Sequence, residues 1–146
     1  MTHTCATTAQ PDGSAPTLEL RAPAESAQLG PLRGVSTALA GQCNMDLDQL
    51  ADLRLAVDEA CSTLLRIAVP DTVIVCRFRL SPDTFRFSAA VTATAAGADT
   101  PIESRFGWHV LRTLTDTLSV DRDHDHDGGE YVSVTISFTM CSGDAT

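Results

Sequence analysis

The stretch EYVSVTISFTM, residues 130–140, alternates apolar side chains with mostly hydroxyl-bearing ones. Successive side chains of a β-strand point to opposite faces of its sheet, so this period of two predicts a strand with one apolar and one polar face. A sheet made of such strands needs cover on its apolar face only. The stretch therefore favours a mostly antiparallel sheet with helices packed on one face.

Three further segments show a strand pattern. Residues 72–80 and 84–94 alternate β-branched and aromatic residues with polar ones on either side of a Ser-Pro-Asp turn, which predicts a β-hairpin. Residues 17–22 alternate in the same way and predict a strand. Residues 1–16 are small, polar and contain proline, so we expect a disordered tail before a single domain at 17–146.

Three segments have helical spacing. A helix is predicted over 23–41, with a Gly-Pro pair that can delay its start. A second helix follows Asp46, a suitable N-cap, and keeps its apolar stripe until Pro70 stops it. A third covers 103–118, and TLSV at its end, residues 117–120, turns towards a strand. A polar turn at 121–129 precedes the last strand. The order β-α-α-β-β-α-β-β gives an α/β (α+β) sandwich as the fold class.

Arginine supplies every positive charge of the chain. There are ten arginines, no lysine, and 19 acidic residues, for a net charge of −9. The absence of lysine excludes the phosphate-binding loop with its lysine, and Schiff-base chemistry. The acidic balance argues against a nucleic-acid partner and suits a basic protein surface. No apolar run reaches the about 18 residues of a membrane span, and no signal-peptide pattern is present, so we expect a cytoplasmic protein.

Cysteine and histidine give little support for metal binding. The five cysteines are scattered and lack a C-x-x-C pair, so we expect reduced thiols rather than a disulfide framework or a zinc site. The turn DRDHDHDGG at 121–129 contains ligand types, among them His124 and His126. A flexible acidic turn before a strand is common, however, and we predict no specific metal site there.

The stretch LRLAVDEACSTLL, residues 53–65, places acidic residues inside an apolar helix. Glu59 and Thr63 are four residues apart, so they share one edge of the helix, away from its buried stripe. The spacing of Glu59 and Thr63 is explained without any function if this edge of the helix faces solvent and Glu59 pairs with Arg66 or Arg54. A functional site on this edge is the alternative, and its support comes from a resemblance.

Residues 17–140 resemble the GHKL family, the histidine-kinase-like ATPases of the Bergerat fold, and among them the serine-kinase anti-sigma factors of the anti-sigma-F type. LRLAVDEACSTLL is similar to the N-box helix of the family, RFGWHVLRTLTDTLSV to its second glycine box, and GGEYVSVTISF to its closing strand. The resemblance implies a site for ATP or ADP with Mg²⁺.

The resemblance assigns roles to residues of the N-box and the first glycine box. Glu59 stands at the position of the general base, and Thr63 replaces the asparagine that holds Mg²⁺. A threonine hydroxyl is a poorer ligand for Mg²⁺ than an amide oxygen, so metal binding should weaken. Gly97 remains of the first glycine box, in which Ala93 replaces the aspartate that binds adenine. Loss of that hydrogen bond costs about 1–3 kcal/mol.

The second glycine box contributes three further candidates. It keeps Gly107, has Arg105 in place of a glycine, and continues to His109. The guanidinium of Arg105 can compensate by reaching a phosphate group, and His109 can face the same pocket. The nucleotide-binding candidates are Glu59, Thr63, Gly97, Arg105, Gly107 and His109.

The resemblance implies two functions. The first is an anti-sigma factor that sequesters an alternative sigma factor of the stress or sporulation type and is released by an anti-anti-sigma antagonist of the STAS type. The second is an active protein serine kinase that phosphorylates this antagonist. Glu59 supports the kinase, while Thr63 and Ala93 argue against it, so binding ranks first.

The resemblance also implies protein contacts. Family members dimerise through the sheet, which predicts a homodimer. Arg33 in GPLRGV resembles an arginine of the first helix that contacts both the sigma factor and the antagonist. A single arginine on an amphipathic helix is otherwise explained by solvation.

Overall fold

The computed structural model describes residues 18–124 and 129–142. Along the chain its elements are β1 (Leu18–Pro23), η1 (Ser26–Gln28), α1 (Leu29–Ala40), α2 (Leu47–Leu65), β2 (Val73–Ser81), β3 (Thr84–Thr94), α3 (Ala95–Ala98), η2 (Ile102–Ser104), α4 (Phe106–Leu114), β4 (Thr117–His124) and β5 (Tyr131–Cys141). The predicted order of strands and helices is confirmed, with the short helices η1, α3 and η2 added. The tail predicted at 1–16 lies outside the described residues, as does His126.

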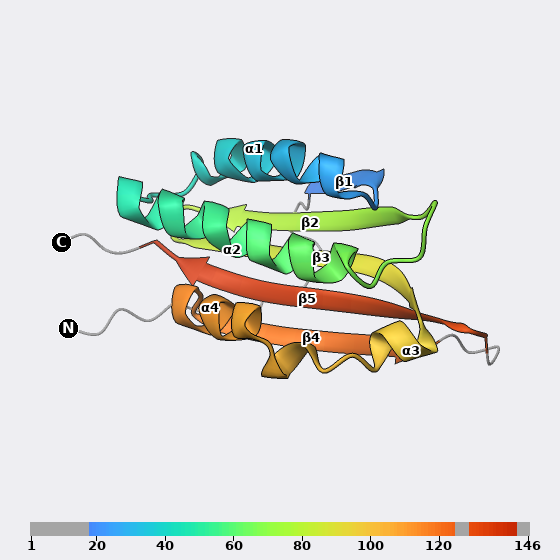
Figure 1. Cartoon of the computed structure of the whole chain (residues 1–146). Helices are drawn as coiled ribbons and strands as arrows, with labels where there is room; N and C mark the ends of the chain where they lie inside the picture. The colour runs from blue at the N-terminus through green and yellow to red at the C-terminus, as the bar shows by residue number, and fades with distance from the viewer. Residues whose placement is uncertain (1–17, 125–128, 143–146) are drawn as a thin grey trace.

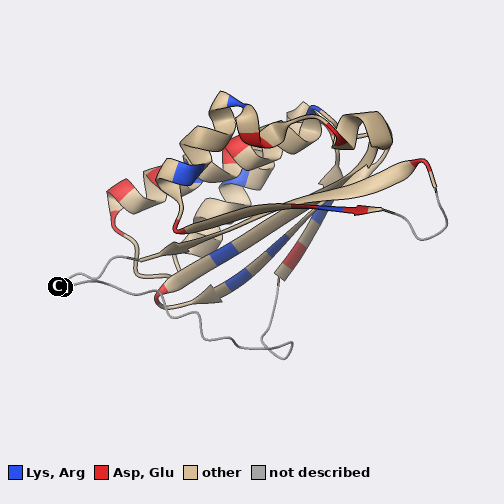
Figure 2. Cartoon of the chain, turned by 90° about the horizontal axis from the view of Figure 1, so that it is seen from below, with Lys and Arg blue, Asp and Glu red and all other residues tan. Residues whose placement is uncertain are grey.

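The strands form one five-stranded sheet in the order β1-β2-β3-β5-β4, and every neighbouring pair is antiparallel. Within the described residues, α1, α2 and α4 lie on one face of this sheet, and the other face has no helix (Figures 1 and 2). The predicted α/β sandwich, an antiparallel sheet with helices on one face, is confirmed. No helix in the described part is long and apolar enough to cross a membrane.

The core lies between the helices and the apolar face of the sheet. The predicted inward residues of β5 are all buried: Val132, Val134, Ile136, Phe138 and Met140. The ring of Phe138 lies 5.1 Å from that of Phe87, and Phe87 lies 5.4 Å from Phe78. These three residues are direct cross-strand partners on β5, β3 and β2. Cross-strand aromatic pairs of this kind fix the register of the sheet.

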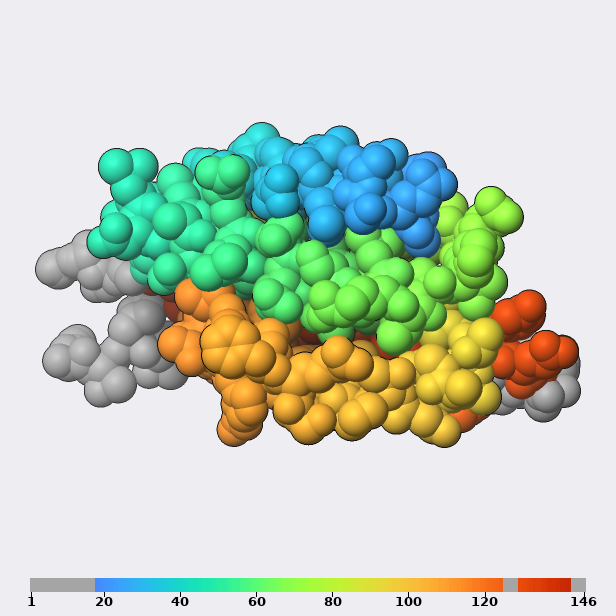
Figure 3. Space-filling model, viewed as in Figure 1, coloured from blue at the N-terminus to red at the C-terminus, as the bar shows by residue number. Residues whose placement is uncertain are grey.

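α2 is the central helix, with α1 on one side of it and α4 on the other (Figures 1 and 3). It begins at Leu47 because Asp46 caps it. The Asp46 carboxylate accepts a hydrogen bond from the Gln49 backbone N–H at 2.8 Å, and the Gln49 side chain accepts one from the Asp46 N–H at 2.9 Å. This reciprocal capping box satisfies two backbone donors that would otherwise have no helical partner. The buried residues of α2 are Leu53, Ala56, Val57, Ala60, Cys61, Thr63 and Leu64.

The predicted third helix, 103–118, is too long at both ends, since α4 covers only Phe106–Leu114. The helix stops because Thr115 takes an extended conformation (φ −118°, ψ 160°) and its hydroxyl donates to the Leu111 carbonyl at 2.7 Å. The chain then continues as edge strand β4 at 117–124. The first residues of the predicted polar turn are therefore strand residues.

Two other helix boundaries differ from the prediction. α1 starts at Leu29 rather than Pro23, after the short turn η1. α2 ends at Leu65, well before Pro70, because Ala68 leaves the helix and forms a β-bridge with Ala93 at the end of β3. The segment after α2 is thereby hydrogen-bonded to the end of β3.

Three of the described cysteines are core residues. Cys43, Cys61 and Cys76 are free and buried. A hydrogen bond with Cys76 and burial raise the pKa of the Cys61 thiol well above its usual value. Cys141 is disulfide-bonded, so the expectation of reduced thiols is wrong at that position.

Candidate functional site

Glu59 projects from α2 toward the start of α4, where it meets Gly107. A Cβ built at Gly107 would lie only 2.7 Å from the Glu59 Cδ, so the carboxyl group occupies the space that a side chain at 107 would need. Glu59 forms no ion pair with a described residue, and the pairing with Arg66 or Arg54 that its spacing allows is absent. Residues of the N-box and of the second glycine box are thus in contact.

Thr63 lies one turn further along α2 and is only 6% exposed. The Arg66 guanidinium donates to its hydroxyl oxygen at 3.5 Å. Thr113 and Thr115 donate their hydroxyl protons to the carbonyl four residues earlier, whereas the Thr63 hydroxyl donates to no described residue. Thr63 therefore holds a buried hydrogen-bond donor at this edge of α2.

A cavity of about 240 Å³ opens beside this turn of α2. Its lining residues are Thr63, Arg66, Ile67, Thr100, Ile102 and Arg105. The end of α2 forms one wall, and the segment that leads into α4 forms the other; the two lie side by side in Figure 3. Two guanidinium groups line the cavity, and no carboxylate does.

Gly97 lies in α3, next to the end of α2. The Thr94 hydroxyl caps α3 by accepting a hydrogen bond from the Gly97 N–H at 3.0 Å. A Cβ built at Gly97 would lie 3.4 Å from the carbonyl oxygen of Ile67, a residue of the cavity wall. Ala93, at the adenine-binding position of the resemblance, is fully buried, and its methyl group cannot accept a hydrogen bond from a base.

Arg105 is the N-cap residue of α4, and its side chain forms no capping hydrogen bond. It is exposed, has no ion pair with a described residue, and lines the cavity. His109 is also exposed on α4 but does not line the cavity. The structure thus brings Thr63 and Arg105 together and leaves His109 outside.

Four lining residues were not predicted from the sequence as site residues, namely Arg66, Ile67, Thr100 and Ile102, and neither was Arg122, which contacts the cavity wall. Arg122 of β4 stabilises the cavity wall. Its guanidinium donates to the carbonyls of Ala98 at 2.6 Å and Thr100 at 3.2 Å. It also pairs with the Glu103 carboxylate at 3.2 Å, and this hydrogen bond lowers the pKa of Glu103. The spacing of Arg66 from Thr63 was a usable signal, but Arg122 was assigned to a turn.

A second candidate region lies on the opposite edge of α2. Arg33 of α1 forms an ion pair with Asp58 of α2, with 2.5 Å between Nη1 and Oδ1. Both side chains remain about one third exposed, at 36% and 33%. A surface hollow of about 450 Å³ beside the pair is lined by Gly30, Arg33, Gly34, Thr37, Ala38 and Arg54. Arg33 therefore lies at the surface but is bonded to the helix that carries Glu59.

The cavity beside Thr63 fits one part of the Mg²⁺–ATP that the resemblance implies. Its guanidinium and hydroxyl groups suit phosphate oxygens. Mg²⁺ prefers carboxylate oxygens, which the lining lacks, and the two guanidinium groups repel a cation. The volume of about 240 Å³ is below the roughly 300–1,000 Å³ of small-molecule sites, so a whole nucleotide does not fit this shape.

Comparison with known proteins agrees with this fold. A family model described as "Histidine kinase-like ATPase domain" matches residues 22–136. Two curated relatives, the anti-sigma-F factor RsbW of Mycobacterium tuberculosis strains CDC 1551 / Oshkosh and ATCC 25618 / H37Rv, are each 37% identical over 108 residues. The match covers 73% of this chain and 62% of each relative, so the chain spans about three fifths of their length.

A solved structure gives a likeness of fold alone. The RsbU and RsbW domains of Rv1364c from Mycobacterium tuberculosis match with a TM-score of 0.57 at 14% identity, over 90% of this chain and 35% of that one. The family model covers most of the chain, from the end of β1 into β5. It describes ATPase domains, so ATP is the ligand that the family implies. The chain belongs to the family of histidine kinase-like ATPase domains.

Proposed function

We propose that the chain is an anti-sigma factor. It binds an alternative sigma factor of the stress or sporulation type, keeps it from RNA polymerase, and releases it when an anti-anti-sigma antagonist of the STAS type binds instead. The observation that carries the proposal is the 37% identity over 108 residues to a relative named anti-sigma-F factor. We further propose that residues 17–146 form one domain and that the protein acts in the cytoplasm.

The surface around Arg33 supports a protein partner. Arg33 uses one N–H group for Asp58, and its side chain remains partly exposed. A guanidinium has five donors, so it can bind a partner carboxylate while it keeps Asp58. The adjoining hollow has two glycines, Gly30 and Gly34, with open space where their side chains would be, so a partner can approach the backbone of α1 closely. The net charge of −9 suits a partner with basic DNA-binding elements.

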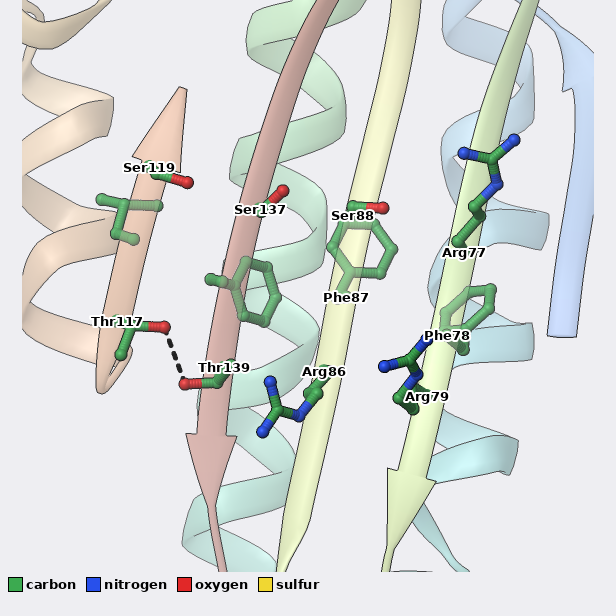
Figure 4. A pocket seen from close by; sticks show the side chains of 12 residues that line it. Arg77, Phe78, Arg79, Arg86, Phe87, Ser88, Thr117, Ser119, Ser137 and Thr139 are labelled. Carbon is green, nitrogen blue, oxygen red and sulfur yellow. Dashed lines mark hydrogen bonds between the residues drawn. The ribbon is translucent and has the colours of Figure 1, made fainter. Parts of the chain in front are cut away.

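The polar face of the sheet supports a homodimer. Arg79 and Arg86 are direct cross-strand partners on this face, and neither has an ion pair with a described residue (Figure 4). Like charges directly opposite each other destabilise a sheet unless something neutralises them. On β4, at the other side of the same face, lie Asp121 and Asp123. Two copies related by a two-fold axis parallel to the strands would place basic halves over acidic ones.

A second candidate function is a protein serine kinase that phosphorylates the antagonist. The observation that favours it is Glu59, a carboxylate with no ion pair among the described residues, held against Gly107. A general base needs such a free carboxylate. Thr63 and the cavity lined by guanidinium groups argue against the metal ion that phosphoryl transfer requires.

The experiment is reconstitution with purified partners. Alternative sigma factors encoded in the same genome are tested for binding by biolayer interferometry, and those that bind are tested in a competition with core RNA polymerase. We expect one sigma factor to bind and to be withdrawn from the polymerase, with transcription lost in proportion. If the protein binds none of the sigma factors but does bind a STAS-type protein, sequestration of a sigma factor is contradicted. Radiolabelled ATP in the same mixture reports on the kinase alternative.

A further inference from the structure

Two arginines converge on the small cavity beside α2 without a negative partner. Arg66 extends from the end of α2, and Arg105 from the start of α4. Neither forms an ion pair with a described residue, and the lining of the cavity contains no carboxylate. Both side chains are exposed and line the same hollow, where two like charges repel each other, so an anion between them would be stabilised.

The hydrogen-bond donors around the cavity point to the same ligand chemistry. The Thr63 hydroxyl is nearly buried and donates to no described residue. α4, nine residues long, starts at the cavity without a side-chain cap. The Trp108 N–H donates to the Arg105 carbonyl at 3.1 Å, and the N–H groups of Phe106 and Gly107 donate to no described residue. Hydroxyl, guanidinium and backbone N–H groups all donate hydrogen bonds, which suits the acceptor oxygens of a phosphoanion.

The helix dipoles do not change the positive charge of the cavity. The cavity meets the C-terminal end of α2, which carries roughly half a negative charge, and the N-terminal end of α4, which carries roughly half a positive charge. These partial charges cancel, and the two full charges of Arg66 and Arg105 remain. The Glu59 carboxylate lies one turn away against Gly107 and does not line the cavity.

We propose that this cavity binds a phosphoanion through Arg66, Arg105 and Thr63 without a divalent metal ion. The guanidinium groups neutralise the charge that Mg²⁺ neutralises in metal-dependent sites, and the volume of about 240 Å³ suits a phosphate chain rather than a complete nucleoside triphosphate. The anion is either the phosphate chain of a nucleotide whose base remains outside or a free inorganic phosphoanion. The proposal concerns the cavity alone and does not depend on binding of a sigma factor.

The test is isothermal titration calorimetry of the full-length protein with pyrophosphate, ATP and adenosine, first with EDTA and then with excess Mg²⁺. We expect pyrophosphate and ATP to bind in EDTA, Mg²⁺ to leave their affinity unchanged or lower it, and added salt to weaken both. Tighter binding of ATP than of pyrophosphate would assign the site to a nucleotide, and equal binding to a free phosphoanion. Binding that requires Mg²⁺, or adenosine that binds as tightly as ATP, would overturn the proposal.

Variants identify the cavity. Arg66→Gln and Arg105→Gln should each weaken pyrophosphate binding by about tenfold or more, because a charged hydrogen-bond donor is lost. Thr63→Val, which keeps the shape of the side chain, should also weaken it. The matched control is Arg112→Gln, an exposed arginine at the other end of α4, which should bind as the wild type does. Equal affinity of all four variants would place the anion elsewhere. Sigma-factor binding, measured separately, should be unchanged in each.

Discussion

Asp58 and Glu59 are neighbours in sequence, but they lie in two different regions. Asp58 faces α1 and is paired with Arg33 at 2.5 Å. Glu59 faces α4 and has Gly107 beside its carboxyl group instead of a cation. The first carboxylate has its counter-charge, while the second has none among the described residues.

Because Asp58 is paired and Glu59 is not, the two edges of α2 suit different binding partners. On the α1 edge, opposite charges are already balanced, so a protein partner that covers the ion pair buries no unpaired charge. On the α4 edge, Arg66, Arg105 and Thr63 have hydrogen-bond donors that no described acceptor uses, apart from the Arg66 N–H group bonded to Thr63. We infer that α2 carries a protein-binding edge and a ligand-binding edge that can be altered separately.

The largest expected effect is on the α1 edge. Arg33→Ala should weaken binding of the sigma factor or the antagonist, because Asp58 loses its counter-charge and the partner loses a donor. A hydrogen-bonded interface arginine contributes about 2–5 kcal/mol, which is roughly thirtyfold to several thousandfold in affinity. Biolayer interferometry measures this, with circular dichroism as the check on folding.

Two matched variants sharpen the comparison of the edges. Arg54→Ala removes another arginine of the same hollow that has no ion pair with a described residue, and it should have a smaller effect. Glu59→Gln lies on the other edge and should leave affinity nearly unchanged. If Arg33→Ala binds both partners as the wild type does, the α1 edge is not the interface.

A change at the start of α2 should affect both edges together. Asp46→Ala removes the capping box, and the loss of an N-cap costs about 0.5–2 kcal/mol of the free energy of unfolding. Urea denaturation measures the loss. Asp48→Ala, in the first turn but outside the cap, is the control and should cost less. A cap variant as stable as the wild type would show that tertiary contacts alone hold this end of the helix.

A smaller effect should appear on the α4 edge, with a defined pH dependence. Arg122 lowers the pKa of Glu103 below its usual value of 4.5, so the ion pair stabilises the folded protein above that pH and is lost as the pH falls through the lowered pKa. Glu103 is about half exposed, so Glu103→Gln should cost less than about 1 kcal/mol at pH 7. Thermal unfolding should show the full difference at pH 7 and a smaller one at pH 3. Glu25→Gln, at an exposed residue that forms no ion pair with a described residue, should show none at either pH.

Removal of metal ions should have no measurable effect on either edge. The described residues contain no group of three or more histidine, cysteine or acidic side chains placed to hold a metal ion. EDTA should therefore leave the melting temperature and partner binding unchanged. A large fall in melting temperature on addition of EDTA to freshly purified protein would reveal a metal site and reopen the interpretation of the turn at 121–129.

The smallest expected signal is phosphotransfer. With Thr63 in place of an amide ligand and Ala93 unable to accept from adenine, we expect little transfer of phosphate from Mg²⁺–ATP to a STAS-type antagonist. Glu59→Gln should then make little difference to the labelling. Stoichiometric serine phosphorylation that disappears in this variant would restore the kinase function.

The fold was largely predictable because strands and helices differ in period. The period of two at 130–140 correctly predicted strand β5. The apolar stripe that follows the N-cap Asp46 correctly predicted helix α2. The boundary between α4 and β4 was not predictable, since Leu118 fits both a helical stripe that continues from Leu114 and the inward face of a strand. The conformation of Thr115 decides between them, and its hydrogen bond to Leu111 is visible only in the folded chain.

The candidate site was only partly predictable. Glu59 and Gly107 belong to two stretches that resemble family motifs, so both were predicted as site residues. The sequence did not show that the two residues are in contact. Arg122 supports the cavity from a strand that the sequence assigned in part to a turn, so its role was hidden. Arg33 was expected at the surface, but its bond to Asp58 depends on how α1 packs on α2, which spacing along one helix does not specify.

The order of the sheet leaves β1 and β4 as its two edges. Open edges can recruit strands from other chains, which leads to aggregation, and charged residues and proline on an edge oppose this. β1 carries Glu19 and Arg21 and ends at Pro23, while β4 has a run of charged residues at 121–123. Both edges are therefore poor templates for strand addition. The proposed partners would therefore bind through the helices or the polar face, and the chain should remain monodisperse at concentrations where an unprotected sheet would form fibrils.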